Sequence, residues 1–144
     1  MKRFVTLLFL CYVCFSCSKN TDSFDVYVNG VKAEIDINKY ISESAELKGH
    51  TLHVSSPDIF TIETNSPSWI YQMNNESIGS PRKPYEKPFP FVIDSNYEWC
   101  SITQINEHTY LLNILETGNK DLIIGFTPVN SDDITHSLLV IESI

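Results

Sequence analysis

Strict alternation of apolar and polar residues is the feature that most constrains how this chain folds. Residues 24–28 (FDVYV) alternate with a period of two, and residues 31–37 (VKAEIDI) do so again. Such alternation is typical of strands that bury one face. Asn29-Gly30 separates the two runs, and this dipeptide favours a type I′ turn because both of its residues tolerate positive φ. The sequence therefore predicts a β-hairpin over 24–37.

Further strand-like runs follow as far as residue 142. They are rich in β-branched and aromatic residues and lie at 51–54, 59–64, 69–73, 91–94, 99–105, 109–116, 122–127 and 137–142. Residues 38–50 are open to two interpretations, a short helical turn or an irregular strand that ends at Gly49. Residues 74–90 contain four prolines, which cannot donate to a sheet ladder, so this segment is predicted to be a loop or an edge. The pattern as a whole predicts an all-β sandwich of about seven to nine short antiparallel strands.

The N-terminal residues have the organisation of an export signal. Lys2 and Arg3 form a short positive region, and residues 4–16 follow without a charge. This apolar run is too short to cross about 30 Å of hydrocarbon as a helix, but it has the length of a signal-peptide core. The competing interpretation is a buried N-terminal helix. We predict a cleaved signal peptide at residues 1–16.

Three cysteines near this signal differ in what surrounds them. Cys11 and Cys14 follow bulky residues, whereas Cys17 follows Ser16 and precedes a polar stretch, SKNTD. This arrangement resembles a bacterial lipoprotein signal, in which the cysteine after a small residue is acylated and becomes the mature N-terminus. Several acyl chains on one residue would anchor the protein stably. The alternative is secretion with cleavage near Cys17 and no lipid.

The expected organisation is therefore a signal peptide (1–16), a lipidated tether (17–23) and one β-sandwich domain (24–144). Cys100 is then the sole cysteine of the domain, so no internal disulfide can form. Cleavage removes Lys2 and Arg3, which leaves 8 basic and 18 acidic side chains and a formal charge of −10. A body of this charge, without a cluster of Lys or Arg, is a poor partner for nucleic acid.

The C-terminal half resembles a known family. The stretch "YEWCSITQINEHTYLLNILETGNKDLIIGF" (97–126), followed by "LLVIES" (138–143), is similar to the BACON-type immunoglobulin-like modules of Bacteroidetes surface lipoproteins. Trp99 takes the position of the tryptophan that opens a strand, and Asn119 takes that of the turn asparagine. The similarity covers roughly residues 51–144. It implies an immunoglobulin-like β-sandwich, often attached to glycan-handling or mucin-binding proteins, and it carries no catalytic residues.

Clusters of titratable residues offer little chemistry. His50 and His53 would point to opposite faces of a strand, and no third ligand stands near them, so we expect no metal site. Asp132-Asp133 with His136 are interpreted as turn chemistry, and the neighbouring carboxylates of Glu34 and Asp36 as a solvent face. No serine-nucleophile motif or phosphate-binding glycine loop is present. We expect neither a cofactor nor an enzyme.

Aromatic residues gather between positions 69 and 99. We expect Trp69 and Trp99 in the core, and we select Tyr71, Tyr85 and Phe89 as candidate ligand-binding residues, because exposed rings bury area at low entropic cost. The predicted protein is a monomeric, non-catalytic outer-membrane or cell-surface lipoprotein that binds a glycan, a mucin or a protein partner, or acts as a scaffold. The alternative is a structural or assembly subunit, such as a fimbrial component, that pairs through its edge strands.

Overall fold

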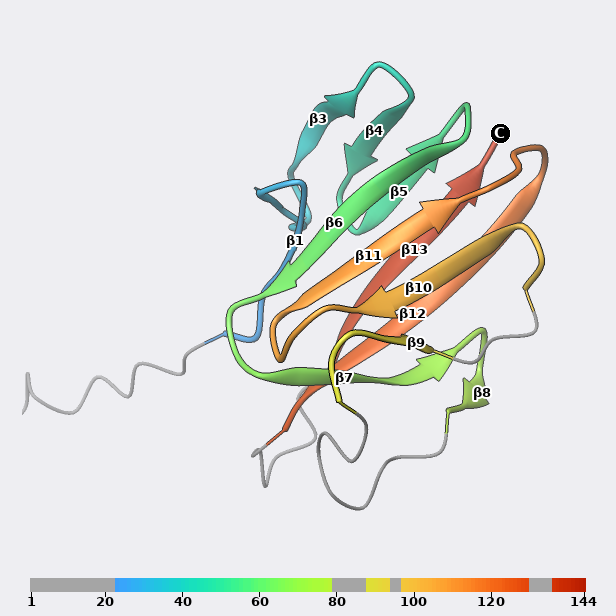
Figure 1. The fold of residues 1–144 in the computed structure, drawn as a ribbon. Helices are drawn as coiled ribbons and strands as arrows, with labels where there is room; N and C mark the ends of the chain where they lie inside the picture. Colours follow the sequence, from blue (N-terminus) through green and yellow to red (C-terminus); the bar gives the residue numbers. More distant parts are fainter. Residues whose placement is uncertain (1–22, 79–87, 94–96, 130–135) are drawn as a thin grey trace, which may run out of the picture.

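The structure is a computed structural model that describes residues 23–78, 88–93, 97–129 and 136–144. Within these ranges the chain forms thirteen β-strands and no helix. The strands build one six-stranded and one seven-stranded sheet, which are stacked as the two layers of a β-sandwich (Figure 1). The all-β prediction is confirmed.

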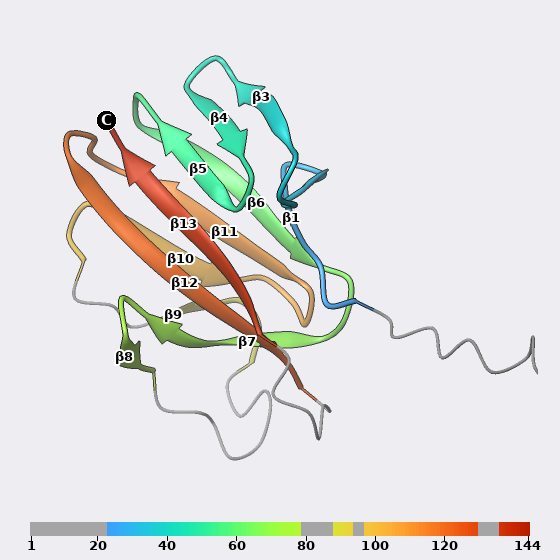
Figure 2. The same ribbon diagram turned by 180° about the vertical axis from the view of Figure 1, so that it is seen from behind.

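The six-stranded sheet has the order β2-β1-β6-β11-β10-β9. Its strands are β1 (Val26–Val28), β2 (Val31–Lys32), β6 (Asp58–Thr64), β9 (Phe91–Ile93), β10 (Cys100–Gln104) and β11 (Thr109–Ile114). The seven-stranded sheet has the order β3-β4-β5-β13-β12-β7-β8 and is seen from its outer side in Figure 2. Its strands are β3 (Asn38–Ser42), β4 (Ala45–Lys48), β5 (Thr51–Val54), β7 (Ser68–Met73), β8 (Glu76–Ser77), β12 (Lys120–Pro128) and β13 (Ser137–Ser143).

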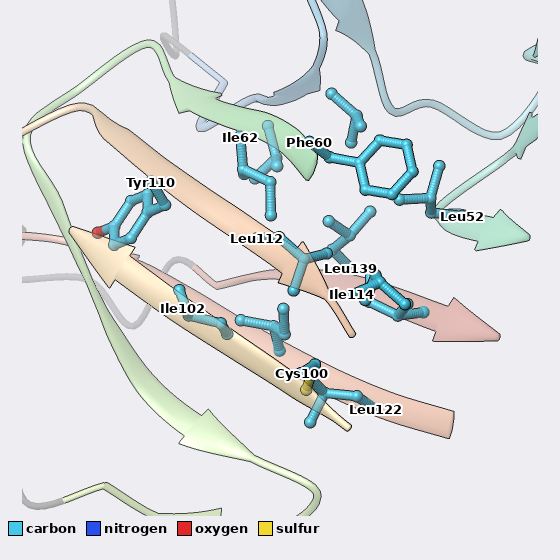
Figure 3. Close-up of a cluster of buried hydrophobic side chains, with 14 of the residues drawn as sticks. Leu52, Phe60, Ile62, Cys100, Ile102, Tyr110, Leu112, Ile114, Leu122 and Leu139 are labelled. Carbon is cyan, nitrogen blue, oxygen red and sulfur yellow. The ribbon is translucent and has the colours of Figure 1, made fainter. Parts of the chain in front are cut away.

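The core lies between the two sheets and follows from the alternation in the sequence. Phe60 and Leu112 of the six-stranded sheet and Leu52 and Leu139 of the seven-stranded sheet are fully buried. Figure 3 shows these side chains gathered in one apolar cluster. Burying a side chain of this size stabilises a fold by about 1.5–3 kcal/mol. The inward-facing apolar residues of the alternating runs therefore supply the main force that holds the two sheets together.

The predicted hairpin at Asn29-Gly30 is confirmed. Both turn residues have positive φ, 47° and 78°, as a type I′ turn requires. The prediction that the second strand extends to residue 37 is wrong, because β2 contains only Val31–Lys32. The chain then turns, with the amide of Ile37 donating to the carbonyl of Glu34 at 3.0 Å, and leaves Ile35 85% exposed. The apolar–polar alternation of the sequence continues to residue 37, beyond the end of β2, because alternation carries no information about whether a partner strand is present.

Residues 38–50 form neither of the two structures considered for them. They contain β3, β4 and the turn that leads to β5, which together make an antiparallel meander at one edge of the seven-stranded sheet. The described residues contain thirteen strands rather than seven to nine, and three of them, β3, β4 and β8, lie outside the runs predicted from the sequence. Glu43 and Ser44 supply the tight turn between β3 and β4.

The expectation that all strands pair antiparallel is wrong for one pair. β13 lies in the middle of the seven-stranded sheet, antiparallel to β12 and parallel to β5. A period-two pattern reports which face of a strand is buried, but it is the same for both directions of pairing. The direction was therefore decided by how the chain crosses between the layers.

A buried polar network lies where β6 of one sheet continues into β7 of the other. The hydroxyls of Thr64 and Ser68 share a hydrogen bond of 2.8 Å, and that of Ser68 lies 3.0 Å from the hydroxyl of Tyr110. Gln104 donates its amide hydrogen to the carbonyl of Ser68 at 3.2 Å. Because every one of these buried groups has a partner, the network fixes the corner between the sheets without an unsatisfied polar group.

Candidate binding surface

Tyr71 lies on the outer face of the seven-stranded sheet, at an irregularity in β7. Met73 pairs with Ile124 and Ile70 pairs with Phe126, so the two residues between them, Tyr71 and Gln72, stand opposite a single residue of β12. That arrangement is a β-bulge, which turns a side chain away from its regular direction. The single residue opposite the bulge is Gly125.

The ring of Tyr71 lies directly over Gly125. A Cβ atom added to this glycine would be 2.7 Å from Cζ of Tyr71 and 2.9 Å from its hydroxyl oxygen, which is closer than any real contact. The ring also packs against His136, with 4.5 Å between ring centroids and 33° between ring planes. The tyrosine is therefore held against the sheet by a glycine on β12 and a histidine just before β13.

Trp69 stands two positions before Tyr71 on the same strand. The prediction that it belongs to the core is wrong, because Ser68 and Ile70 on either side of it are buried toward the interior while Trp69 is only partly buried. Its indole Nε1 is buried but has no hydrogen-bond partner among the described residues. Because this nitrogen is buried, the indole can offer a ligand only the exposed part of its ring. Trp99, in contrast, is buried at 8% exposure, as predicted.

We call the four residues Trp69, Tyr71, Gly125 and His136 the aromatic platform. It adjoins apolar side chains of the same outer face, among them Leu138, which is 46% exposed. The rings of Trp69, Tyr71 and His136, with the phenol hydroxyl and the imidazole nitrogens, make an amphipathic surface above the buried Gly125. Such a surface suits a ligand that combines apolar faces with hydrogen-bonding groups.

The other candidate residues are not brought to this platform. Phe89 precedes β9, at the edge of the six-stranded sheet, and its ring stacks on that of Phe91 with 5.7 Å between centroids. Tyr85 and the lipidation candidate Cys17 lie outside the described residues, as do Asp132 and Asp133. Of the three predicted ligand-binding residues, Tyr71 is the one that the described structure places on the aromatic platform.

The remaining titratable candidates are either exposed or paired with a neighbouring side chain. His50 lies in an exposed turn, whereas His53 on β5 places Nδ1 3.1 Å from a carboxylate oxygen of Glu142 on β13. Glu34 and Asp36 are exposed and precede β3. Within the described ranges, no three His, Cys, Asp or Glu side chains are grouped so that they could hold a metal ion.

Cys100 is a buried thiol on β10. Burial raises its pKa to about 11, which the positive charge of Lys120 opposes only in part. The thiolate is the reactive form of cysteine, so this residue is a core side chain without nucleophilic character at neutral pH.

Comparisons of the chain with protein-family models, with curated proteins and with solved structures gave no match. Among the described residues, no helix has the length and apolar character needed to cross a membrane. The aromatic platform therefore has to be interpreted from its own chemistry.

Sequence reasoning selected Tyr71 but missed its three companions. One signal was available for Gly125, because a glycine inside a strand often marks a close approach by another group. For Trp69, the alternation Ser68-Trp69-Ile70 leaves open which set faces inward, since two apolar residues compete for one core position. No local signal could bring His136 to Tyr71, because 65 positions of sequence separate these residues.

Proposed function

We propose that this chain is an exported, lipid-anchored β-sandwich, attached through Cys17, that works as a non-catalytic binding or scaffolding module at the outer membrane or cell surface. Its topology would be immunoglobulin-like, as the resemblance to BACON-type modules implies. The ligand would be a glycan, a mucin or a protein partner, and the aromatic platform would be the place where it binds.

The observation that carries this proposal is the platform itself. Trp69 points away from the core, because it stands between the buried residues Ser68 and Ile70 and is itself only partly buried. Tyr71 is held flat over Gly125, so little side-chain entropy would be lost when a ligand covers its ring. An ordered ring beside a second partly exposed ring, that of Trp69, is the arrangement expected of a binding surface rather than of ordinary solvent-facing residues.

The edges of the sheets favour a binding module over an assembly subunit. In the described part of the chain, β2 and β8 have two residues each and β9 has three, which is little for another chain to pair with. The longest edge strand, β3, carries Lys39 and an irregularity between Tyr40 and Ser42. Short strands, bulges and lysines are the devices that discourage pairing at an edge.

The anchor is tested by labelling cells that express the full chain with palmitate. Wild type and the Cys14→Ala variant should incorporate the label, and Cys17→Ala should not, because only the cysteine after Ser16 is expected to be acylated. Label that persists in Cys17→Ala would disprove the attachment site. Label that is absent from all three proteins would support ordinary secretion.

The platform is tested on glycan and mucin arrays with the full-length protein. Binding should fall about tenfold or more for Tyr71→Ala and for Trp69→Ala, since burying an aromatic ring against a ligand contributes about 1.5–3 kcal/mol. Tyr27→Ala is the matched control, because Tyr27 is a partly exposed tyrosine on the outer side of the other sheet. Equal binding by all three variants would place the ligand elsewhere.

A further inference from the structure

Hydrogen bonds and an ion pair hold the chain at the point where it enters the β-sandwich. Asn65, in the turn between β6 and β7, donates from Nδ2 to the carbonyl of Ser23 at 2.6 Å and accepts the amide hydrogen of Asp25 on Oδ1 at 3.0 Å. The amide of Asn65 also donates to the carbonyl of Asp25 at 3.3 Å. Lys32 forms an ion pair with Asp25 at 3.2 Å. Residues 23–25 are therefore part of the folded domain and do not lengthen the tether.

These contacts lie at one end of the sandwich, which we call the entry end. The turn between β10 and β11 is beside it, because the amide of Ser68 donates to the carbonyl of Glu107 at 2.9 Å and that of Thr64 to the carbonyl of His108 at 2.9 Å. The C-terminal Ile144 lies at the opposite end, next to the end of β5, where its amide donates to the carbonyl of Val54 at 2.9 Å. Figure 1 shows the two ends well separated.

The proposed anchor would stand very close to the entry end. Only residues 18–22 separate Cys17 from Ser23. Even a fully extended chain of this length reaches no more than about 20 Å, which is comparable with the length of one strand of the domain.

We infer that the entry end is the surface that faces the lipid bilayer, and that the opposite end, with Glu116 and Ile144, is presented outward. This inference rests on the proposed attachment through Cys17. The occupant of the surface is a bilayer, held there by the tether. Charge does not hold it, since the entry end carries Glu107 and a domain of net charge −10 has no general attraction to anionic headgroups.

The orientation has a consequence for the aromatic platform. Tyr71 is three positions from Ser68, which lies at the entry end, so the platform stands about 10 Å from that end at the rise of a β-strand. It opens sideways from the outer face of the seven-stranded sheet. A ligand would therefore reach it along the membrane surface, in the half of the domain nearer the lipid.

The test compares two probes on full-length, lipid-processed protein reconstituted into phosphatidylcholine vesicles that contain a headgroup-labelled acceptor lipid. Glu107→Cys places a donor fluorophore at the entry end, and Glu116→Cys places one beyond the other end of β11. Both glutamates are exposed, and both variants change the charge equally. Cys100 is buried and does not compete for the label. Energy transfer to the bilayer should be several-fold more efficient from position 107, because the six-residue strand β11 separates the two heights by about 20 Å.

Equal transfer from both positions, or stronger transfer from position 116, would overturn the inference while leaving the anchor intact. Failure of the protein to associate with vesicles would instead overturn the proposed lipid attachment, and the orientation with it. As a further control, ten Gly and Ser residues inserted between Thr21 and Asp22 should lower transfer from position 107 and reduce the difference between the two probes, since a longer flexible tether relaxes the constraint.

Discussion

At the scale of single residues, two asparagines perform the same task in the two sheets. Asn29 and Asn74 each begin a hairpin turn with φ of 47°. The side-chain oxygen of Asn29 accepts the amide hydrogen of Thr61 at 2.8 Å, and that of Asn74 accepts the amide hydrogen of Ile123 at 2.7 Å. Each asparagine thus turns its own strand and continues the ladder to the neighbouring strand, a combination that glycine, which has no side-chain acceptor, could provide only in part.

Replacing Asn29 by alanine should destabilise the protein by roughly 1–3 kcal/mol, because it loses one hydrogen bond and places a Cβ-bearing residue at positive φ. Urea unfolding monitored by circular dichroism measures this. Asn29→Asp keeps the acceptor and tolerates the same φ, so its loss should be clearly smaller. Equal losses for the two variants would show that the contact with Thr61 contributes nothing.

Gly125→Ala should destabilise the protein by about 1 kcal/mol, because the new methyl group would lie 2.7 Å from the far end of the Tyr71 side chain and would force it to shift. The same substitution in a Tyr71→Ala background should be nearly neutral, since the clash is removed. A double-mutant cycle of urea unfolding measures this coupling. A penalty of the same size in both backgrounds would mean that Gly125 is required by its strand and not by the tyrosine.

At the scale of elements, polar groups tie the two sheets together at both ends. One link is the buried network of Thr64, Ser68 and Tyr110. The other joins the β3–β4 hairpin to β6, where the carboxylate of Asp58 accepts hydrogen bonds from the hydroxyls of Ser44 and Ser42, the latter at 3.0 Å. Apolar packing between the two sheets is not directional. The polar links are directional, and they determine which turns lie next to each other.

The Asp58 link predicts a pH dependence. Hydrogen bonds from the hydroxyl of Ser44, the amide of Ile59 and the hydroxyl of Ser42 lower the pKa of Asp58 below its ordinary value of 3.8. A lowered pKa in the folded state stabilises the fold above the unfolded value, and this stabilisation disappears as the pH falls through the folded value. Asp58→Asn should therefore be less stable than wild type at neutral pH and should converge with it in strong acid.

Urea unfolding at a series of pH values would follow this convergence. Ser44→Ala removes the largest of the three contributions and should reduce the pH dependence without abolishing it. Stability curves for wild type and Asp58→Asn that remain parallel down to the acid range would contradict the assignment.

At the scale of the whole molecule, the last strand is also the central one. β13 separates β12 from β5 in the seven-stranded sheet and buries Leu139 and Ile141 completely. The meander of β3, β4 and β5 therefore joins the rest of its sheet only through the C-terminal strand.

Removal of residues 137–144 should abolish the cooperative unfolding transition, because it divides the seven-stranded sheet into two parts and exposes the core. Thermal unfolding followed by circular dichroism tests this prediction. Leu138→Ser is the control, since Leu138 lies on the same strand but is 46% exposed, and it should retain a sharp transition. A truncated protein that still unfolds cooperatively would show that the six-stranded sheet folds on its own.

Much of this architecture was predictable from local patterns, and the strands after residue 90 lie close to their expected positions. Alternation identifies Phe60, Leu112 and Leu139 as core residues because side chains of a strand point to opposite faces in turn. The turn at Asn29-Gly30 was predictable because its backbone angles exclude most other residues. The polar stretch after Cys17 and the net charge of the chain likewise follow directly from the amino-acid sequence.

Pairing was not predictable, and the candidate binding surface depends on pairing. The parallel contact of β5 with β13, the two extra strands between residues 38 and 48, and the outward position of Trp69 all depend on which strand lies beside which. The same is true of Tyr71, whose neighbours Gly125 and His136 come from distant parts of the sequence. By itself the sequence determined which faces of the strands are buried, since burial follows from hydrophobic residues at a fixed period. Only the tertiary structure decided which exposed residues lie next to each other, because contacts between strands depend on pairing direction and register, which alternation does not encode.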